Sequence, residues 1–251
     1  MPTIRDYRIL LCGLALCSLT WLALAATSQD NTTSIAQDPA VKGLRKQLLY
    51  ADDFKHGLSG WTIEAEKPGH IEAKDGVLDI DVPAGATLWF KTKLQGPLLI
   101  EYQAKIIAKG GPNDRASDLN CFWMATDPRT PDDLFAAPRH GAFAEYNSLL
   151  TYYVGLGGNG NTTTRFRRYI GSQTDRPLLP ENDLSDPSSL IVPNRTESIQ
   201  LLAQRESIAY YRNEQRVFQL RDAHPYSNGW FGLRTTKNHM QITGFKVYRL
   251  R

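Results

Sequence analysis

The sequence predicts an all-β protein built as an antiparallel β-sandwich. Segments rich in β-branched and aromatic residues follow one another along the chain, and Gly, Pro, Asn or Asp residues separate them. Helical periodicity is almost absent from the same region. The segments 208–212 and 216–220 flank Asn213-Glu214-Gln215 in the pattern of a β-hairpin, which places neighbouring strands antiparallel.

The chain begins with the features of a secretory signal peptide over residues 1–25. Arg5 and Arg8 precede the apolar run 9–24, which is shorter than the ~20 residues that a membrane span needs. Ala23-Leu24-Ala25 ends this run as a small-residue cleavage site. We therefore expect a secreted or periplasmic protein with no membrane association after cleavage.

The rest of the chain predicts a leader and one domain. Residues 26–46 are polar and have no strong period, which is typical of a flexible leader. Residues 47–251 predict one β-sandwich domain, because this length supports a single sizeable core and no repeat or linker divides it. The formal net charge of +3 is too small to indicate a nucleic-acid-binding protein. Signal cleavage leaves Cys121 as the single cysteine, which predicts a buried thiol.

The strands of this domain are predicted in order along the chain, and Gly244 interrupts the last of them as a β-bulge would. Two long connections, 127–148 and 171–194, are rich in Pro and Asp, and loops of this length usually carry function or cover a site. The predicted strands are 47–54, 70–81, 87–93, 97–108, 119–125, 150–154, 164–170, 197–204, 207–212, 215–220, 229–235 and 239–250.

Residues 151–169 are the most informative stretch, because they predict a strand, a Gly-rich turn and a second strand. Successive side chains of a strand point to opposite faces, so Arg165 and Arg167 share one face and Arg168 points to the other. Both faces carry polar side chains, which favours binding of a polar, anionic ligand. A solvated, salt-bridged hairpin is the alternative interpretation.

Five motifs lie near the two ends of the predicted domain: Asp52-Asp53-Phe54, 58–61, 75–80, 229–235 and 242–248. They resemble the ends of a concanavalin A-like (laminin G-like) jelly-roll domain. The internal motifs 113–125 and 152–169 further resemble an uncharacterised bacterial and fungal family of this fold, which is found among polysaccharide-degradation proteins. The resemblance implies this fold and a polysaccharide or oligosaccharide as the partner.

Elimination across a uronic acid needs a group that neutralises the sugar carboxylate and a base that removes the C5 proton. Arg165 can hold a carboxylate, and His239 or Tyr153 can move a proton. Jelly-roll alginate lyases are similar in using Arg, Gln, His and Tyr on a concave sheet, although Asn159 stands where their catalytic tyrosine would align. We therefore predict β-elimination of an acidic, uronate-containing polysaccharide. The predicted catalytic residues are His239, Tyr153 and Arg165, and the predicted substrate-binding residues are Asn120, Trp123, Asp118, Asn159, Asn161 and Arg167.

Two other functions fit the same sequence. A glycoside hydrolase would use paired carboxylates gathered from separate segments, for which Asp114, Asp118 and Glu145 are the candidates, although no Glu-x-Asp-x-x-Glu motif is present. A carbohydrate-binding module would hold the glycan without cleaving it. No cofactor is expected, because the histidines lack metal-ligand spacing. The fold class accommodates a structural calcium ion, with Asp52 and Asp53 as candidate ligands.

Overall fold

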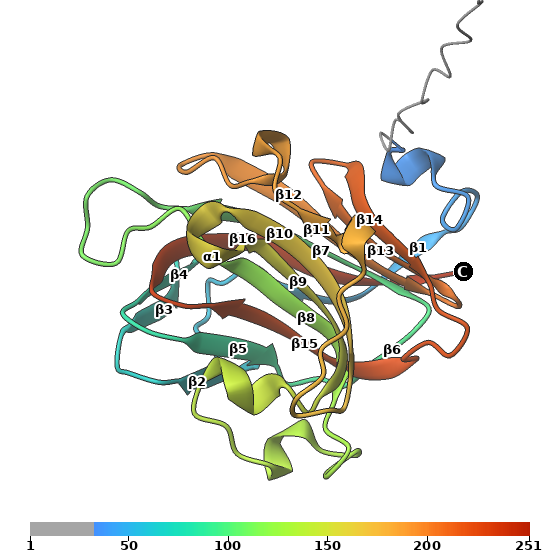
Figure 1. The fold of residues 1–251 in the computed structure, drawn as a ribbon, viewed down its shortest axis with the longest axis horizontal. Helices are drawn as coiled ribbons and strands as arrows, with labels where there is room; N and C mark the ends of the chain where they lie inside the picture. Colours follow the sequence, from blue (N-terminus) through green and yellow to red (C-terminus); the bar gives the residue numbers. More distant parts are fainter. Residues whose placement is uncertain (1–32) are drawn as a thin grey trace, which may run out of the picture. The chain divides into compact units, whose positions relative to one another are not determined.

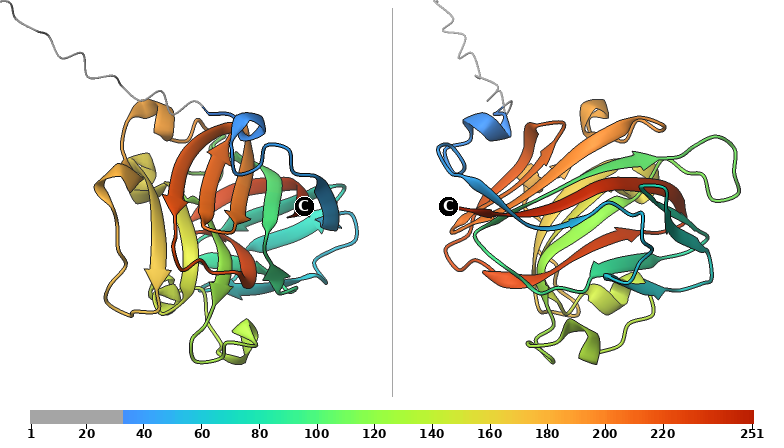
Figure 2. Two further views of the ribbon diagram at one scale, coloured as in Figure 1. Left: turned by 90° about the vertical axis from the view of Figure 1, so that its right-hand side faces the viewer. Right: turned by 180° about the vertical axis from the view of Figure 1, so that it is seen from behind.

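The computed structural model describes residues 33–251, so the predicted signal peptide and the beginning of the predicted leader lie outside the described part. Two eight-stranded antiparallel sheets, called sheet A and sheet B, pack face to face (Figure 1; Figure 2). This arrangement confirms the predicted fold class, an antiparallel β-sandwich of the jelly-roll type. Within residues 33–251, no helix has the length and apolar character needed to cross a membrane.

Sheet A has the strand order β14-β13-β12-β7-β16-β4-β3, and β1 pairs with β16. In that order its strands are Gln215–Arg221, Ser207–Arg212, Thr196–Gln204, Leu98–Ile106, Asn238–Leu250, Val77–Val82 and His70–Lys74, with β1 at Lys46–Asp52. Sheet B has the order β11-β10-β9-β8-β15-β5-β2, and β6 pairs with β15. In that order its strands are Asp183–Leu184, Thr163–Ile170, Leu150–Gly157, Leu119–Thr126, Asn228–Thr235, Ala86–Phe90 and Trp61–Ala65, with β6 at Leu94–Gln95.

Short helical turns occupy several of the connections. The turn α1 joins β9 to β10, and η2 and η3 lie in the long connection between β8 and β9. The bounds of these turns are η1 (Ile35–Gln37), η2 (Leu134–Ala136), η3 (Phe143–Tyr146), α1 (Gly158–Asn161), η4 (Pro180–Asn182) and η5 (Pro187–Ser189).

The predicted hairpin and the predicted bulge are both confirmed. β13 pairs antiparallel with β14, and Asn213 and Glu214 between them have φ angles of 52° and 67°. Two consecutive positive φ values give the turn whose twist matches that of antiparallel strands. In β16 the pairing register with β7 shifts between Thr243 and Lys246, where Gly244 has a φ of 63°. Glycine adopts this left-handed conformation at little cost, so the bulge forms there.

Some strands differ from the sequence prediction. The predicted segment 70–81 is two strands, β3 and β4, because Asp75 and Gly76 both have positive φ and form a turn between them. The strands β2, β6 and β11 have no predicted counterpart. In β2 the buried Glu64 and the exposed Ile63 reverse the usual relation between polarity and burial. The pattern of β2 therefore carries no strand signal.

The main core lies between the two sheets, where each strand points alternate side chains inward. In β8, Cys121 and Trp123 are fully buried in this core. The Trp61 ring centroid lies 6.2 Å from that of Phe231 and 5.1 Å from that of Phe245, so β2, β15 and β16 meet in one aromatic cluster. Burial of these large rings contributes strongly to the hydrophobic stabilisation of the fold.

The single cysteine of the described chain gives a direct test of this packing. Cys121 has no exposed surface, and burial raises the pKa of its thiol to about 12. Because the thiolate is the reactive form, we expect the folded protein to resist a thiol reagent at about pH 8. In increasing denaturant, the Cys121 thiol should react with the reagent in step with the loss of native tryptophan fluorescence. Rapid reaction of the folded protein would contradict the described burial.

Residues 34–45 pack on the outer face of sheet A (blue in Figure 2). Ile35 and Val41 are buried there against apolar side chains of the sheet. The Asp38 carboxylate, 1% exposed, accepts hydrogen bonds from the Tyr211 hydroxyl at 2.5 Å and the Arg216 guanidinium at 3.0 Å. This part of the predicted flexible leader therefore belongs to the folded domain. The sequence boundary falls too late because a few apolar anchors are dispersed in a polar stretch.

Candidate functional site

The outer face of sheet B carries polar residues in rows that cross its strands. In one row Arg165 of β10 lies opposite Gly155 of β9. Gly155 lies in turn opposite Asn120 of β8, which pairs with Arg234 of β15. Since Gly155 has no side chain, the row has a gap between Arg165 and Asn120.

The neighbouring row places Tyr153 between Phe122 and Arg167. A Cβ atom on Gly155 would lie 3.0 Å from the Tyr153 hydroxyl oxygen, so the ring leans along β9 and its hydroxyl lies over the gap. This hydroxyl makes no hydrogen bond to residues 33–251, although Tyr153 is only 6% exposed. Burial, together with the neighbouring Tyr169, raises the pKa of Tyr153 well above its ordinary value. Tyr153 is therefore a protonated hydrogen-bond donor at neutral pH.

A cavity of about 520 Å³, called the arginine pocket, opens over this gap. Its volume lies in the range of small-molecule and glycan-unit sites. Strands β9 and β10 form its floor, and the α1 turn and four other connections form its walls. It is lined by Arg115, Asp118, Phe143, Tyr153, Gly155, Gly158, Asn159, Gly160, Thr163, Arg165, Arg167, Arg176 and Thr236.

Two of the lining arginines have no carboxylate partner in the described part of the chain. The Arg167 guanidinium donates to the backbone carbonyl of Arg176, and the Arg176 guanidinium lies 5.1 Å from the Phe143 ring centroid. Within residues 33–251, neither arginine forms an ion pair, whereas Arg165 pairs with Asp183 at 2.8 Å. Burial lowers the pKa of Arg167, and the charges of Arg176 and Arg165 act in the same direction. Arginine nevertheless stays protonated, so this side of the pocket carries uncompensated positive charge.

Asp118 also lines the pocket, and hydrogen bonds hold it in place. Its Oδ2 atom accepts from Arg115 Nη2 at 2.5 Å and from Ser117 Oγ at 2.5 Å. Thr236 Oγ1 donates to the same oxygen at 2.8 Å. Asp118 Oδ1 receives only a long contact of 3.4 Å from Asn120 Nδ2, and Asn120 Oδ1 is buried without a partner among residues 33–251. A ligand hydroxyl that donates to these oxygens would satisfy groups that are otherwise costly to bury.

The segment 139–146 covers the other half of this face, over β15, β5 and β2 (yellow-green in Figure 1). The Arg139 side chain, 1% exposed, pairs with Glu64 at 3.3 Å and with Asp127 at 3.2 Å. The Tyr146 hydroxyl donates to Glu64 at 2.8 Å. This buried network fixes the segment to the sheet, so the arginine pocket is the part of the face that stays open.

Arg234 lies beneath this covering segment with 1% of its surface exposed. Its Nη1 atom donates to Thr87 at 2.8 Å and to the Gly141 carbonyl at 2.9 Å. Its guanidinium lies 4.9 Å from the Phe143 ring centroid and 4.7 Å from that of Tyr146. No carboxylate of residues 33–251 pairs with Arg234, and its Nε and Nη2 atoms have no partner there. The pocket therefore has a buried positive charge behind its Phe143 wall.

The structure brings together six of the nine predicted site residues. Five of them line the arginine pocket, and a sixth lies at the gap over Gly155. Asn159 is exposed at the rim, where its side chain donates to the Thr163 hydroxyl at 3.2 Å. The five lining residues are Tyr153, Arg165, Arg167, Asp118 and Asn159, and the sixth is Asn120.

Trp123 and Asn161 lie away from the pocket, which corrects their predicted roles. Strand alternation places Trp123 on the face opposite Asn120, and its fully buried ring stacks on Phe166 at 5.8 Å. It offers no surface to a sugar. The Asn161 side chain donates to the Ile191 carbonyl at 2.9 Å and accepts from the Ile191 amide at 2.8 Å. Asn161 therefore fixes the α1 turn to the 171–194 connection.

His239 lies on the outer face of sheet A, on the opposite side of the sandwich from the pocket. Met240 and Ile242 of the same strand point into the core, so His239 points outward. Its ring nitrogens contact Asp114 at 3.0 Å and Asp79 at 3.2 Å. The predicted cooperation of His239 with Tyr153 is therefore wrong, because the sequence pattern of β16 does not reveal to which sheet it belongs.

His239 should instead affect stability. Burial lowers the pKa of His239, but hydrogen bonds to Asp114 and Asp79 outweigh burial and raise the pKa above its ordinary value. The resulting stabilisation is fully present below the unfolded pKa of about 6.5 and is lost as the pH rises through the folded pKa. We expect His239→Gln to lower the free energy of unfolding by about 1 kcal/mol at about pH 5.5 and by less at about pH 8.5. Denaturant titration at both pH values checks this, and equal losses would contradict it.

Several pocket residues were beyond the sequence prediction. Phe143 and Arg176 belong to the long connections 127–148 and 171–194, whose length already indicated that they cover a site. Thr236 follows β15 directly. No residue pattern indicates that these loops meet, because each approaches the pocket from a different strand end.

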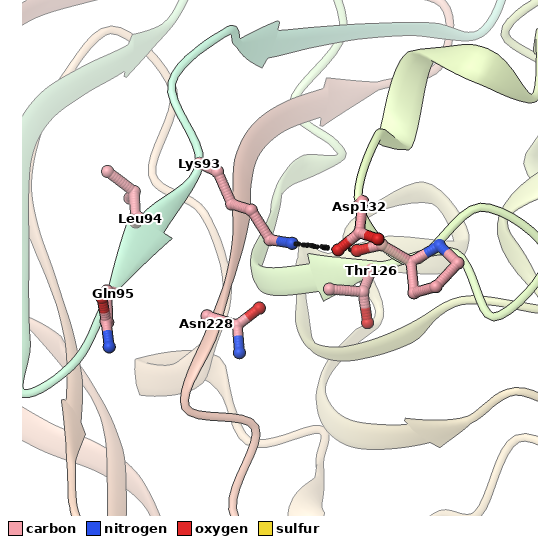
Figure 3. A pocket seen from close by; sticks show the side chains of 7 residues that line it. Lys93, Leu94, Gln95, Thr126, Asp132 and Asn228 are labelled. Carbon is pink, nitrogen blue, oxygen red and sulfur yellow. Dashed lines mark hydrogen bonds and ion pairs between the residues drawn. The ribbon is translucent and has the colours of Figure 1, made fainter.

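A second cavity of about 620 Å³ lies near β6 and the end of β8 (Figure 3). Its cation, Lys93, pairs with Asp132 at 3.8 Å and donates to the Pro131 carbonyl at 2.9 Å. The remaining labelled residues are uncharged. This cavity therefore lacks the uncompensated charge and the tyrosine hydroxyl of the arginine pocket, and we take the arginine pocket as the candidate site.

Among residues 33–251, no group of three or more His, Cys, Asp or Glu side chains is placed to hold a metal ion. The two candidate calcium ligands have other partners. The Asp52 carboxylate accepts hydrogen bonds from the Phe54 amide at 2.8 Å and the Trp61 indole at 2.8 Å. Asp53 accepts from the Lys55 amide at 3.1 Å.

The fold places the chain in a class of jelly-roll sandwiches. It resembles a protein of unknown function with a galectin-like fold from Bacillus subtilis, at 16% identity and a TM-score of 0.65, over 82% of this chain and 98% of that chain. It also resembles an endo-β-1,3-glucanase from Pyrococcus furiosus, at 9% identity and a TM-score of 0.57, over 84% of this chain and 97% of that one. A third similar structure is the carbohydrate-binding module CBM66 from Bacillus subtilis, at 12% identity and a TM-score of 0.50, over 76% of this chain and 96% of that one. These identities show a shared fold.

A family model described as a domain of unknown function, DUF6250, matches residues 80–245. The match spans more than half of the chain, so the chain belongs to the DUF6250 family. A comparison with curated proteins found no match.

Proposed function

We propose that this protein is exported, binds an acidic, uronate-containing glycan in the arginine pocket and cleaves it by β-elimination. One observation carries the proposal: the unpaired Tyr153 hydroxyl shares a pocket with Arg167 and Arg176, which have no carboxylate partner within residues 33–251. A carbohydrate as the ligand is supported by similar structures, which include the module CBM66 and an endo-β-1,3(4)-glucanase of family GH16, and the choice of a uronate rests on the two arginines.

Carboxylate recognition is the first step. Guanidinium groups bind carboxylates through charge-assisted, often bidentate hydrogen bonds, which are about twice as strong as neutral ones. Arg167 is the cross-strand neighbour of Tyr153, and Arg176 contacts the Phe143 ring, which lies 5.7 Å from the Tyr153 ring. A uronate carboxylate held there would have its charge neutralised, which makes the neighbouring C5 proton more acidic.

Proton transfer is the second step. Asp118, through its weakly bonded Oδ1 atom, accepts the C5 proton as the C4–O bond breaks and a C4=C5 double bond forms. Tyr153 donates its proton to the departing glycosidic oxygen, and its raised pKa keeps it in the protonated form that this role needs. Solvent then returns the proton from Asp118 to Tyr153. The reaction involves no cofactor.

The geometry favours elimination over hydrolysis by a pair of carboxylates. In most glycoside hydrolases, both the retaining and the inverting route use two carboxyl groups that flank the scissile bond. The lining residues include a single carboxylate, that of Asp118, while Asp114 and Glu145 bind His239 and His140 elsewhere.

A carbohydrate-binding module is the second candidate. It is favoured by the hydrogen bonds that Asp118 Oδ2 accepts from Arg115, Ser117 and Thr236, because they hold the carboxylate in one position as an acceptor for ligand hydroxyl groups. In this case the pocket would bind the uronate without turning it over.

One screen separates these functions. The purified protein is incubated with polyuronates and with neutral β-glucans, and absorbance at about 235 nm, new reducing ends and calorimetric binding are followed. A rise in absorbance at about 235 nm indicates elimination, because the product is unsaturated. New reducing ends without this rise indicate hydrolysis. Binding without either change indicates a carbohydrate-binding module. Tyr153→Phe should keep binding and lower turnover by at least about 100-fold. Absence of binding to every polyuronate would overturn the proposal.

A further inference from the structure

The arginine pocket has a closed inner end. On the side of β15, the Phe143 ring lies 5.7 Å from the Tyr153 ring and above the Arg234 guanidinium. From Phe143 the covering segment runs across β15 and β5 to β2, where a Cβ atom on Gly141 would lie 2.6 Å from the Glu66 amide nitrogen. No space for a sugar chain remains between this segment and the sheet.

The connection after β10 closes a second side. The Arg176 guanidinium lies 5.1 Å from the Phe143 ring centroid and 5.9 Å from that of Tyr169. The Arg167 guanidinium donates to the Arg176 carbonyl and so holds this connection over β10. At the edge of the sheet, Arg165 of β10 forms an ion pair with Asp183 of β11, and this pair borders the pocket.

The exposed residues of the pocket are all at its other end. Asn159 and Gly160 of the α1 turn and Arg115 of the loop before β8 are exposed, whereas Tyr153 and Phe143 at the inner end are buried or half-buried. A ligand therefore enters beside the α1 turn and stops at Phe143.

The inner wall is rigid. Arg139, Glu64 and Asp127, which fix the covering segment, have side chains that are 1%, 7% and 0% exposed. Opening this wall would break a buried ion-pair network, and removing one partner from such a network costs several kcal/mol. An internal stretch of a polysaccharide needs two openings, and this pocket offers one.

Building on the proposed function, we infer that the arginine pocket receives the end of a uronate chain and not an internal segment. The terminal sugar places its carboxylate near Arg167 and Arg176, and the rest of the chain leaves past the α1 turn. This terminal sugar is the reducing-end uronate, because elimination breaks its C4–O bond and the rest of the chain departs on that oxygen. Cleavage at this site releases unsaturated monosaccharides from the reducing end.

Calorimetric titration of the purified protein with uronate oligosaccharides of increasing length and with the parent polymer tests this inference. A chain-end site binds one protein molecule per chain. Once the oligosaccharide is longer than a few sugar units, its Kd per chain changes by less than about twofold with further length. A site for internal segments gives several proteins per polymer and a Kd per chain that falls in proportion to length, and this result would overturn the inference. Neutral oligosaccharides of the same lengths serve as the control.

The time course of cleavage provides an independent readout. Release from a chain end yields short products from the first minutes with little loss of viscosity, whereas early products of mixed length with a rapid fall in viscosity would overturn the inference. The proposed function fails in a different way, namely by absence of binding to any uronate of any length.

Discussion

Replacing Arg167 by Ala should weaken uronate binding, or kcat/KM where turnover is measured, by about 100-fold, which corresponds to about 3 kcal/mol. The guanidinium is half-buried and has no carboxylate partner within residues 33–251, so its charge is available to a ligand anion. Calorimetry with a uronate oligosaccharide measures the effect. Arg167→Lys should recover only part of the loss, because an ammonium group cannot make a bidentate contact.

Arg168 provides the matched control on the same strand. Its side chain points to the opposite face, where its Nε atom donates to Asp222 at 2.6 Å and its guanidinium lies 4.3 Å from the Tyr226 ring centroid. Arg168→Ala should leave uronate affinity within about threefold but lower the free energy of unfolding by about 2 kcal/mol, since the buried Asp222 loses its cationic partner and keeps only the hydrogen bonds from Tyr152 and the His224 amide. Equal loss of affinity in both variants would show that the ligand binds elsewhere.

Replacing Glu64 by Ala should lower the free energy of unfolding by about 3–5 kcal/mol. The carboxylate accepts hydrogen bonds from the Trp89 indole at 2.9 Å and the Tyr146 hydroxyl at 2.8 Å, and it forms an ion pair with Arg139 at 3.3 Å. Its removal leaves two buried donors unpaired and a buried guanidinium with only Asp127 for charge compensation.

Denaturant titration of Glu64→Ala measures this loss, and Arg221→Ala is the control. Arg221 pairs with Glu206 at 2.9 Å, but both side chains are largely exposed, so its replacement should cost less than about 1 kcal/mol. A similar small cost for Glu64→Ala would mean that the covering segment 139–146 contributes little to stability.

The sequence predicts those parts of the fold and site that local chemistry determines. The hairpin at Asn213 and Glu214 and the bulge at Gly244 follow from residues that accept positive φ. Arg165 and Arg167 share one face because successive side chains of a strand alternate between its two faces. This alternation depends only on the local backbone, so the sequence suffices to predict it.

The other parts depend on partners distant in sequence. Glu64 is buried because Arg139, in a loop distant in sequence that covers the same face of the sheet, neutralises it, so the pattern of β2 hides a strand. His239 begins a strand whose sheet is decided by pairing with β4 and β7, and no local signal encodes that choice. Arg176 reaches the pocket only because the β10 connection folds back over its own strand.

The buried charge of Arg234 has a consequence for the conditions under which the pocket works. Mobile ions screen exposed charges over a Debye length of about 8 Å at physiological ionic strength, but they screen buried charges much less. Arg234 is 1% exposed behind Phe143 and has no carboxylate partner within residues 33–251, so its field reaches the pocket through protein rather than through water. Attraction for an anionic sugar should therefore persist in concentrated salt, where exposed arginines such as Arg115 lose most of their influence.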